Sequence, residues 1–261
     1  MKPAKIIGFA VLAGFVGLIL YGFTREARNP ETPRQKKAAE DLEKIADTML
    51  ERADADLVKQ LMGEDLGDRR FKFSVVMEAA SGKKVIPFSS ADGIHVRIHE
   101  AVTAALENAS SKLSEPNSPV RGLRRINEAS RFFEDLLLQT LDAQPDLAAS
   151  IPTTTDGRHQ RSGYPDLRIE HVPSGTVFYL DPKLVEETSW DSTLRTFYFE
   201  PKSGSLKITE DAVHLLAGIP HDGSDGQWTF GKAELVDLSS TTLRLKPEFQ
   251  ASNRDLYPQE R

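Results

Sequence analysis

Hydrophobic and polar residues alternate most regularly between residues 163 and 184, in the sequence GYPDLRIEHVPSGTVFYLDPKL. Leu167 and Ile169 fall on one face of the first half, and Phe178 and Leu180 fall on one face of the second, which is the period of a strand. The letters VPSG between the halves are typical of a turn. The segment therefore predicts a β-hairpin with one apolar and one polar face.

The length of this turn decides which residues of the two strands face each other. If the turn has four residues, His171 pairs with Thr176, and counting back places Asp166 opposite Asp181. A turn of three residues would instead place Asp166 opposite Pro182. We expect the first register, and with it two carboxylates that share the polar face of the hairpin.

The chain before residue 91 shows three further patterns. Residues 6–23 carry no charge, and a helix of that length approaches the ~30 Å core of a bilayer, which predicts a single-pass transmembrane helix. No small-x-small cleavage pattern follows, and basic residues on both flanks leave the orientation open. From about Thr32 apolar residues recur at helical spacing, so a juxtamembrane helix should pack on the domain or pair with a second copy. FKFSVVMEA and KVIPFSS predict a β-hairpin around residues 81–83.

The chain after residue 90 predicts a mixed α/β domain. Asp92 can cap a helix that runs to about Leu113, and a second helix should run from about Val120 to Leu141. LRIEH, TVFYLDP and LRTFYFEP are strand candidates, ITEDAVHLLAGI is expected to be the last helix, and WTFGKAELVDL contains the last strand. The predicted core order is therefore α-β-β-β-α-β, preceded by extra N-terminal helices and the single transmembrane helix.

These patterns divide the chain into four parts. We expect a transmembrane anchor at 1–30, a juxtamembrane helix and β-hairpin at 31–90, the α/β domain at 91–250, and a C-terminal tail at 251–261.

Composition and charge exclude several kinds of protein. With 39% hydrophobic and 28% charged residues the chain is an ordinary globular protein, and its length suits one main domain. Cysteine is absent, which excludes disulfides, thiolate zinc sites and cysteine nucleophiles. The net charge of −6 argues against a protein that coats nucleic acid, although a single cleft could still bind it locally.

The polar face of the central hairpin carries the candidate chemistry. Two facing carboxylates such as Asp166 and Asp181 repel each other unless a cation lies between them. Oxygen ligands suit Mg²⁺, which keeps several waters and accepts phosphate as a further ligand. Lys183 lies on the same face, where its ammonium could orient or help deprotonate an attacking water, or stabilise charge on phosphate oxygens.

The residues Pro165-Asp166 and Asp181-Pro182-Lys183 resemble the motif of the PD-(D/E)XK nuclease superfamily, the fold of many restriction and repair endonucleases. In that family the two acids hold the metal and the lysine acts on the nucleophilic water. The resemblance covers about residues 120–240, and it implies that 91–250 is a restriction-endonuclease-like nuclease domain. The proline inside the second motif removes a backbone donor, which implies a bulge or a strand at an edge.

A glutamate on the helix before the strands often completes the site in this superfamily. Glu134, in the sequence FFEDL, is the first candidate and Glu128 is the second. The resemblance therefore implies that Asp166, Asp181 and Glu134 bind Mg²⁺ or Mn²⁺ and that these residues act in catalysis together with Lys183.

The resemblance implies a divalent-metal-dependent nuclease that hydrolyses phosphodiester bonds in DNA, and the uncharged run at residues 6–23 predicts that this nuclease is membrane-anchored. Its location would be the cell membrane, with contact to the lipid bilayer through residues 6–23 and with the side of the soluble domain undetermined. The alternative is a membrane-tethered scaffold or binding protein with a non-catalytic nuclease-like fold. The two hypotheses differ in geometry, because only the enzyme needs its carboxylates and lysine close together in space.

Overall fold

The structure is a computed structural model that describes residues 33–64, 66–193, 197–201, 206–223, 226–246, 248 and 251–252. Arg69–Leu245 form one compact unit. Helix α2 (Pro33–Gly63) belongs to a second unit, and it confirms the helix predicted to begin near Thr32. Several apolar side chains of α2 are exposed, namely Leu42, Ile45, Met49, Leu50, Leu57, Leu61 and Met62.

The compact unit contains both helices and strands. The helices are α3 (Phe73–Ser81), α4 (Gly93–Ser114) and α5 (Ser130–Asp142), with the short 3-10 helices η1 (Ile126–Ala129), η2 (Glu187–Ser189) and η3 (Leu238–Ser240). The strands are β1 (Arg70–Lys72), β2 (Val85–Ile86), β3 (Leu147–Ser150), β4 (Leu167–His171), β5 (Thr176–Glu186), β6 (Ala212–His221), β7 (Glu234–Asp237) and β8 (Thr242–Arg244).

Most of these strands form one mixed sheet in the order β2-β6-β5-β4-β3, and β7 also pairs with β6. Strand β4 runs antiparallel to β3 and β5, whereas β5 and β6 run parallel. Strands β1 and β8 form a separate antiparallel pair, which joins the two ends of the compact unit. Strand β5 is therefore central, with β4 on one side and β6 on the other.

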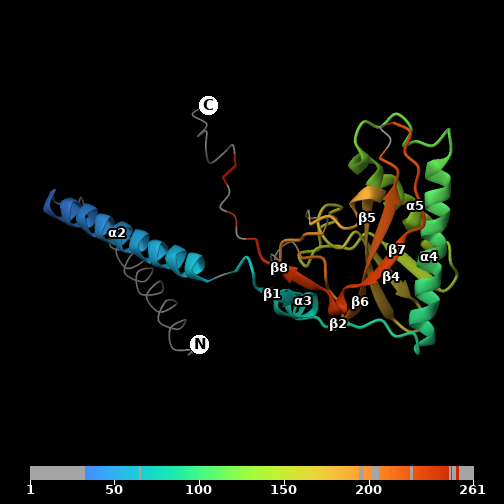
Figure 1. Cartoon of the computed structure of the whole chain (residues 1–261). Coiled ribbons are helices and arrows are strands. Elements are labelled where there is room, and N and C mark those ends of the chain that lie inside the picture. The colour runs from blue at the N-terminus through green and yellow to red at the C-terminus, as the bar shows by residue number, and fades with distance from the viewer. Residues whose placement is uncertain are drawn as a thin grey trace. The chain divides into compact units, whose positions relative to one another are not determined.

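Each face of the sheet is covered by its own apolar cluster. Helices α4 and α5 lie side by side along one face (Figure 1), where Phe178 and Leu180 of β5 are fully buried beneath them. Val177 and Tyr179 of the same strand belong to the cluster on the other face, together with Phe73 and Met77 of α3. The predicted alternation of β5 is thus confirmed, and its polar residues extend along the α3 side of the sheet.

The predicted register of the central hairpin is confirmed. His171 pairs with Thr176, and the ladder continues to Leu167 opposite Leu180. The turn has four residues and ends at Gly175, whose φ of +71° favours glycine. Beyond this ladder β5 continues alongside β6 without β4, which explains how a proline at position 182 fits into the strand.

The last predicted helix is wrong, and with it the α-β-β-β-α-β order. The segment ITEDAVHLLAGI forms loop and then β6, which pairs with β5, β2 and β7. Because both faces of β6 are buried, its apolar residues form a run without alternation, and such a run does not distinguish a strand from a buried helix.

Three other predicted elements also differ from the structure. FKFSVVMEA forms mainly α3 rather than a strand of a hairpin, because its apolar residues cover one face of the sheet from a helix. The helix predicted from Val120 begins at Ser130, after the turns and η1 that follow α4. Residues 197–201, the last part of LRTFYFEP, form no strand. The helix capped by Asp92 is confirmed as α4, since its carboxylate accepts from the N–H groups of residues 94 and 95.

The predicted transmembrane helix requires a correction. Within the part of the chain that the structure describes, no helix is long and apolar enough to cross a membrane. Residues 6–23, on which that prediction falls, lie outside the described residues. The fold that the structure describes is thus a mixed α/β domain, and the predicted transmembrane helix, membrane location and lipid contact have no support in the described residues.

Candidate active site

The central hairpin brings three of the four predicted residues into direct contact. Asp181 and Lys183 lie on one face of β5, and Asp166 immediately precedes β4 beside them. The Nζ atom of Lys183 forms ion pairs with Oδ2 of Asp181 and, at 3.6 Å, with Oδ2 of Asp166. One ammonium group therefore lies against both carboxylates, as the register of the hairpin predicted.

The two partners of this ammonium differ in their exposure to water. The side chain of Asp181 is 2% exposed and that of Asp166 is 15% exposed. Burial, and then the charge of Asp166, raise the pKa of Asp181 to about 7. The buried Oδ2 of Asp181 receives no hydrogen bond of good geometry, so the ion pair with Lys183 is what compensates it.

Lys183 remains a cation because of these acids. Burial acts to lower the pKa of Lys183, but the charges of Asp181 and Asp166 outweigh it, and the pKa is raised. At neutral pH this side chain is an ammonium group that can stabilise negative charge, rather than a free amine that could accept a proton.

Glu134 approaches the site from helix α5. Burial, and then the charge of Asp166, raise the pKa of the Glu134 carboxyl, which also interacts electrostatically with Lys183. Its Oε2 lies 3.4 Å from the guanidinium of Arg161, which also contacts Asp135 at 2.7 Å. Glu128, the second candidate, is exposed on η1.

The carboxylates at the site suit an ion that needs few protein ligands. In the described parts of the chain, no group of three or more His, Asp or Glu side chains is arranged to hold a metal ion. Mg²⁺ needs only one or two carboxylates, because waters and substrate phosphate complete its shell. The unsatisfied Oδ2 of Asp181 and the adjacent carboxylate of Asp166 fit such an ion, with Glu134 close enough to act on it electrostatically.

Sequence reasoning missed two basic residues at this site. Arg161 reaches Glu134 from the loop before β4, and Lys207 is 1% exposed in the loop before β6. Lys207 interacts electrostatically with all four predicted residues. Neither residue lies in a motif, and the sequence signal for the buried position of residue 207 is its two apolar neighbours, Leu206 and Ile208.

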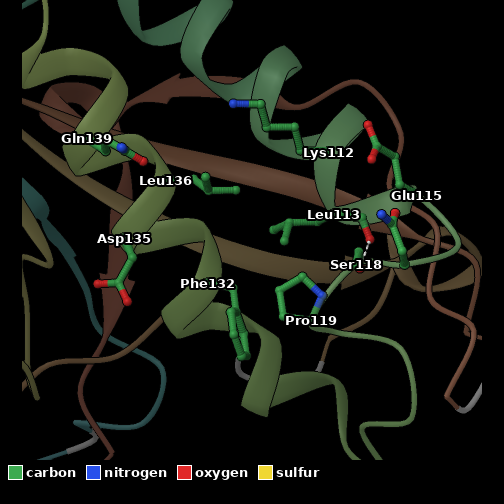
Figure 2. Close-up of a pocket in the computed structure, with 10 residues that line it drawn as sticks. Lys112, Leu113, Glu115, Ser118, Pro119, Phe132, Asp135, Leu136 and Gln139 are labelled. Carbon is green, nitrogen blue, oxygen red and sulfur yellow. Dashed lines mark hydrogen bonds between the residues drawn. The ribbon is translucent and has the colours of Figure 1, made fainter.

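A separate hollow of about 460 Å³ lies between the end of α4 and the outer side of α5. Figure 2 shows Leu113, Pro119, Phe132 and Leu136 around it. Its carboxylates are not paired with each other, since Asp135 is engaged by Arg161. The hollow is lined by Lys112, but among the described residues no ion pair joins this lysine to two carboxylates, as happens at the hairpin.

Two comparisons with known proteins indicate the same family. The model of the type II restriction enzyme MjaV family matches residues 66–260, a range that contains the whole site. The type II restriction enzyme MjaV of Methanocaldococcus jannaschii is 26% identical over 202 residues, which cover 72% of this chain and 85% of that protein.

Proposed function

Because the chain belongs to the type II restriction enzyme MjaV family and is therefore an endonuclease, a phosphodiesterase, we propose that it cleaves DNA with a PD-(D/E)XK centre. The proposed centre consists of Asp166, Asp181 and Lys183, with Glu134 beside them. The alternative of a non-catalytic scaffold is set aside, because the family is one of enzymes.

The contact of one ammonium with two carboxylates, one just before β4 and one in β5, is the observation that carries this proposal. Surface lysines usually pair with single exposed acids, and such pairs contribute little to stability. In contrast, Asp181 is buried and its pKa is raised to about 7, a perturbation that is typical of functional sites.

A divalent cation is part of the proposal, and Asp166 and Asp181 would hold it. When bound, Mg²⁺ or Mn²⁺ would offset the charge of these acids and neutralise charge on the phosphate that is attacked. Glu134 would act on the bound ion electrostatically, without binding it directly.

The residues of the chain contribute orientation and charge to phosphodiester hydrolysis. The Lys183 ammonium donates hydrogen bonds to phosphate oxygens or to the attacking water, and it stabilises the negative charge that develops as the P–O bond breaks. Arg161 contacts the carboxylate of Glu134 and helps to keep it in place.

The test is cleavage of duplex DNA by the purified full chain, with Mg²⁺ or Mn²⁺ and with EDTA. Cleavage should require the metal, and Lys183→Ala should slow it by about 10²–10⁴-fold. Asp181→Asn should also weaken metal binding. Lys84→Ala, which removes an exposed lysine outside the site, is the matched control and should cleave normally. Equal cleavage by wild type and Lys183→Ala would refute the proposed centre.

A further inference from the structure

Lys207 is a buried lysine whose own hydrogen bonds do not neutralise its charge. The side chain is 1% exposed. Its Nζ donates to the backbone carbonyls of Gln160 at 3.2 Å and Arg161 at 3.4 Å. Carbonyl groups are neutral, whereas lysine is almost never fully buried unless negative charge compensates it. The compensating charge must therefore come from acids near this position.

The nuclease site supplies this negative charge. Burial lowers the pKa of Lys207, and its favourable interactions with Asp166, Asp181 and Glu134 offset part of this effect, against a smaller repulsion from Lys183. The segment that holds its ammonium is also attached to the site, because the guanidinium of Arg161 contacts Glu134. Lys207 is thus buried within electrostatic reach of the acids, and two backbone carbonyls hold its ammonium group.

We propose that Lys207 is a positioning residue that sets the charge of the nuclease site, being held by the carbonyls of residues 160 and 161 and offsetting the three nearby carboxylates. It does not touch substrate, because it is buried. It acts through the acids, limiting how tightly they bind a divalent cation and reducing their repulsion of phosphate. Both effects rest on the metal site of the proposed function, and the second rests in addition on the proposed binding of DNA.

Removing the ammonium group of Lys207 should change the affinities for Mg²⁺ and for DNA in opposite directions. An ammonium close to a cation site repels the incoming ion, so removing that ammonium strengthens ion binding. The same ammonium attracts phosphate, so removing it weakens DNA binding while no ion is present. Damage to the fold of the site would weaken the binding of both Mg²⁺ and DNA. Opposite changes in the two affinities therefore distinguish the loss of the Lys207 charge from such damage.

The experiment compares the full chain with Lys207→Met, which keeps the length of the side chain and removes its charge. Mg²⁺ binding is measured by calorimetry without DNA, and DNA binding is measured by fluorescence anisotropy in EDTA at low, fixed salt. We expect Mg²⁺ to bind at least about threefold more tightly and DNA at least about threefold more weakly. Should Lys207→Met not fold, Lys207→Gln makes the same comparison.

Two further variants serve as controls. Lys207→Arg keeps the charge and should restore both affinities to within about twofold of wild type. Lys84→Met removes the same charge from an exposed position, where solvent screens it, and should change neither affinity by more than about twofold.

The Mg²⁺ affinities of wild type and Lys207→Met decide the role of Lys207. Weaker or unchanged Mg²⁺ binding by a folded Lys207→Met overturns it, and so does a wild-type chain that binds no Mg²⁺. If wild type binds Mg²⁺ but neither binds nor cleaves DNA, the proposed function fails, while the calorimetric comparison still decides the role of Lys207.

Discussion

Two glutamates that are six residues apart, Glu128 and Glu134, differ sharply in their surroundings in the fold. Glu134 is on α5, with its pKa raised by burial and by Asp166 and with Arg161 against it. Glu128 is exposed on η1, six residues earlier. Their comparison separates an effect of the site from a general effect of losing one negative charge.

We predict that Glu134→Gln lowers the cleavage rate by about 10–100-fold, the size expected when a partner behind the direct metal ligands is lost. The loss should be smaller than that of Asp181→Asn. Glu128→Gln should cleave at the wild-type rate. Initial rates on one DNA substrate at saturating Mg²⁺ provide the measurement, and equal rates for the two glutamine variants would contradict the role of Glu134.

His214 is a second residue whose properties depend on its surroundings. It is fully buried in β6, and its Nδ1 shares a hydrogen bond of 2.7 Å with the hydroxyl of Tyr164. Burial lowers its pKa from 6.5 to about 3, so the imidazole is neutral in the folded protein. The unfolded chain takes up a proton at this position below about pH 6.5, which the folded chain does not, and stability is therefore lost as pH falls from 6.5 toward 3.

We predict that His214→Gln makes the protein less sensitive to acid. Between pH 6 and 4, wild type should lose about 1.4 kcal/mol more unfolding free energy per pH unit than the variant. Urea unfolding at several pH values measures both slopes. The variant is expected to be less stable at pH 7.5, so only the difference in slope tests the prediction, and parallel slopes would contradict it.

At the scale of elements, helix α5 connects the core to the site. Its buried face contributes Phe133, Leu137 and Leu141 to the cluster beneath α4, and its partly exposed side carries Glu134. The ring of Phe133 meets that of Phe230 edge to face, with centroids 4.8 Å apart. The position of Glu134 therefore depends on the apolar packing of the adjacent face of the same helix.

We predict that Leu137→Ala lowers the free energy of unfolding by about 2–5 kcal/mol, because it leaves a cavity in a close-packed core. Leu137 is fully buried, so the loss of unfolding free energy should fall within this range. Gln139→Ala, at an exposed position of the same helix, should change stability by less than about 0.5 kcal/mol. Chemical denaturation distinguishes the two, and a similar small change in both variants would show that α5 is loosely packed.

At the scale of the whole molecule, the compact unit Arg69–Leu245 contains the complete sheet and all the site residues. Its two ends are joined by the pairing of β1 with β8. The family match begins at residue 66, close to the start of this unit. A domain with its own core and paired ends is expected to fold alone.

We predict that a chain lacking residues 1–65 folds and cleaves DNA within about threefold of the full chain, because the core of the compact unit remains complete. A chain lacking residues 1–75 should fail to fold, since it loses β1 and the buried Phe73, whose removal alone would cost about 3–5 kcal/mol. Circular dichroism and the cleavage assay provide the measurements. Loss of folding in the first variant would show that the second unit stabilises the first.

Short-range patterns in the sequence determined the hairpin and the start of α4. Alternation, a turn of four residues and a capping carboxylate at Asp92 involve neighbours along the chain, so they predict strand faces and register without tertiary contacts. The same local register predicted that Asp166 and Asp181 share a face, and the structure has them beside one ammonium, that of Lys183.

Only the tertiary structure decided the remaining features, because they depend on residues far apart in the chain. Strand β6 is a strand because β5, β2 and β7 supply its hydrogen bonds and cover its apolar run, which by itself fits a buried helix equally well. Lys207 is enclosed because a loop about 46 residues earlier provides the carbonyls for its ammonium. Burial and long-range charge are properties of the folded chain, and they make this lysine part of the site.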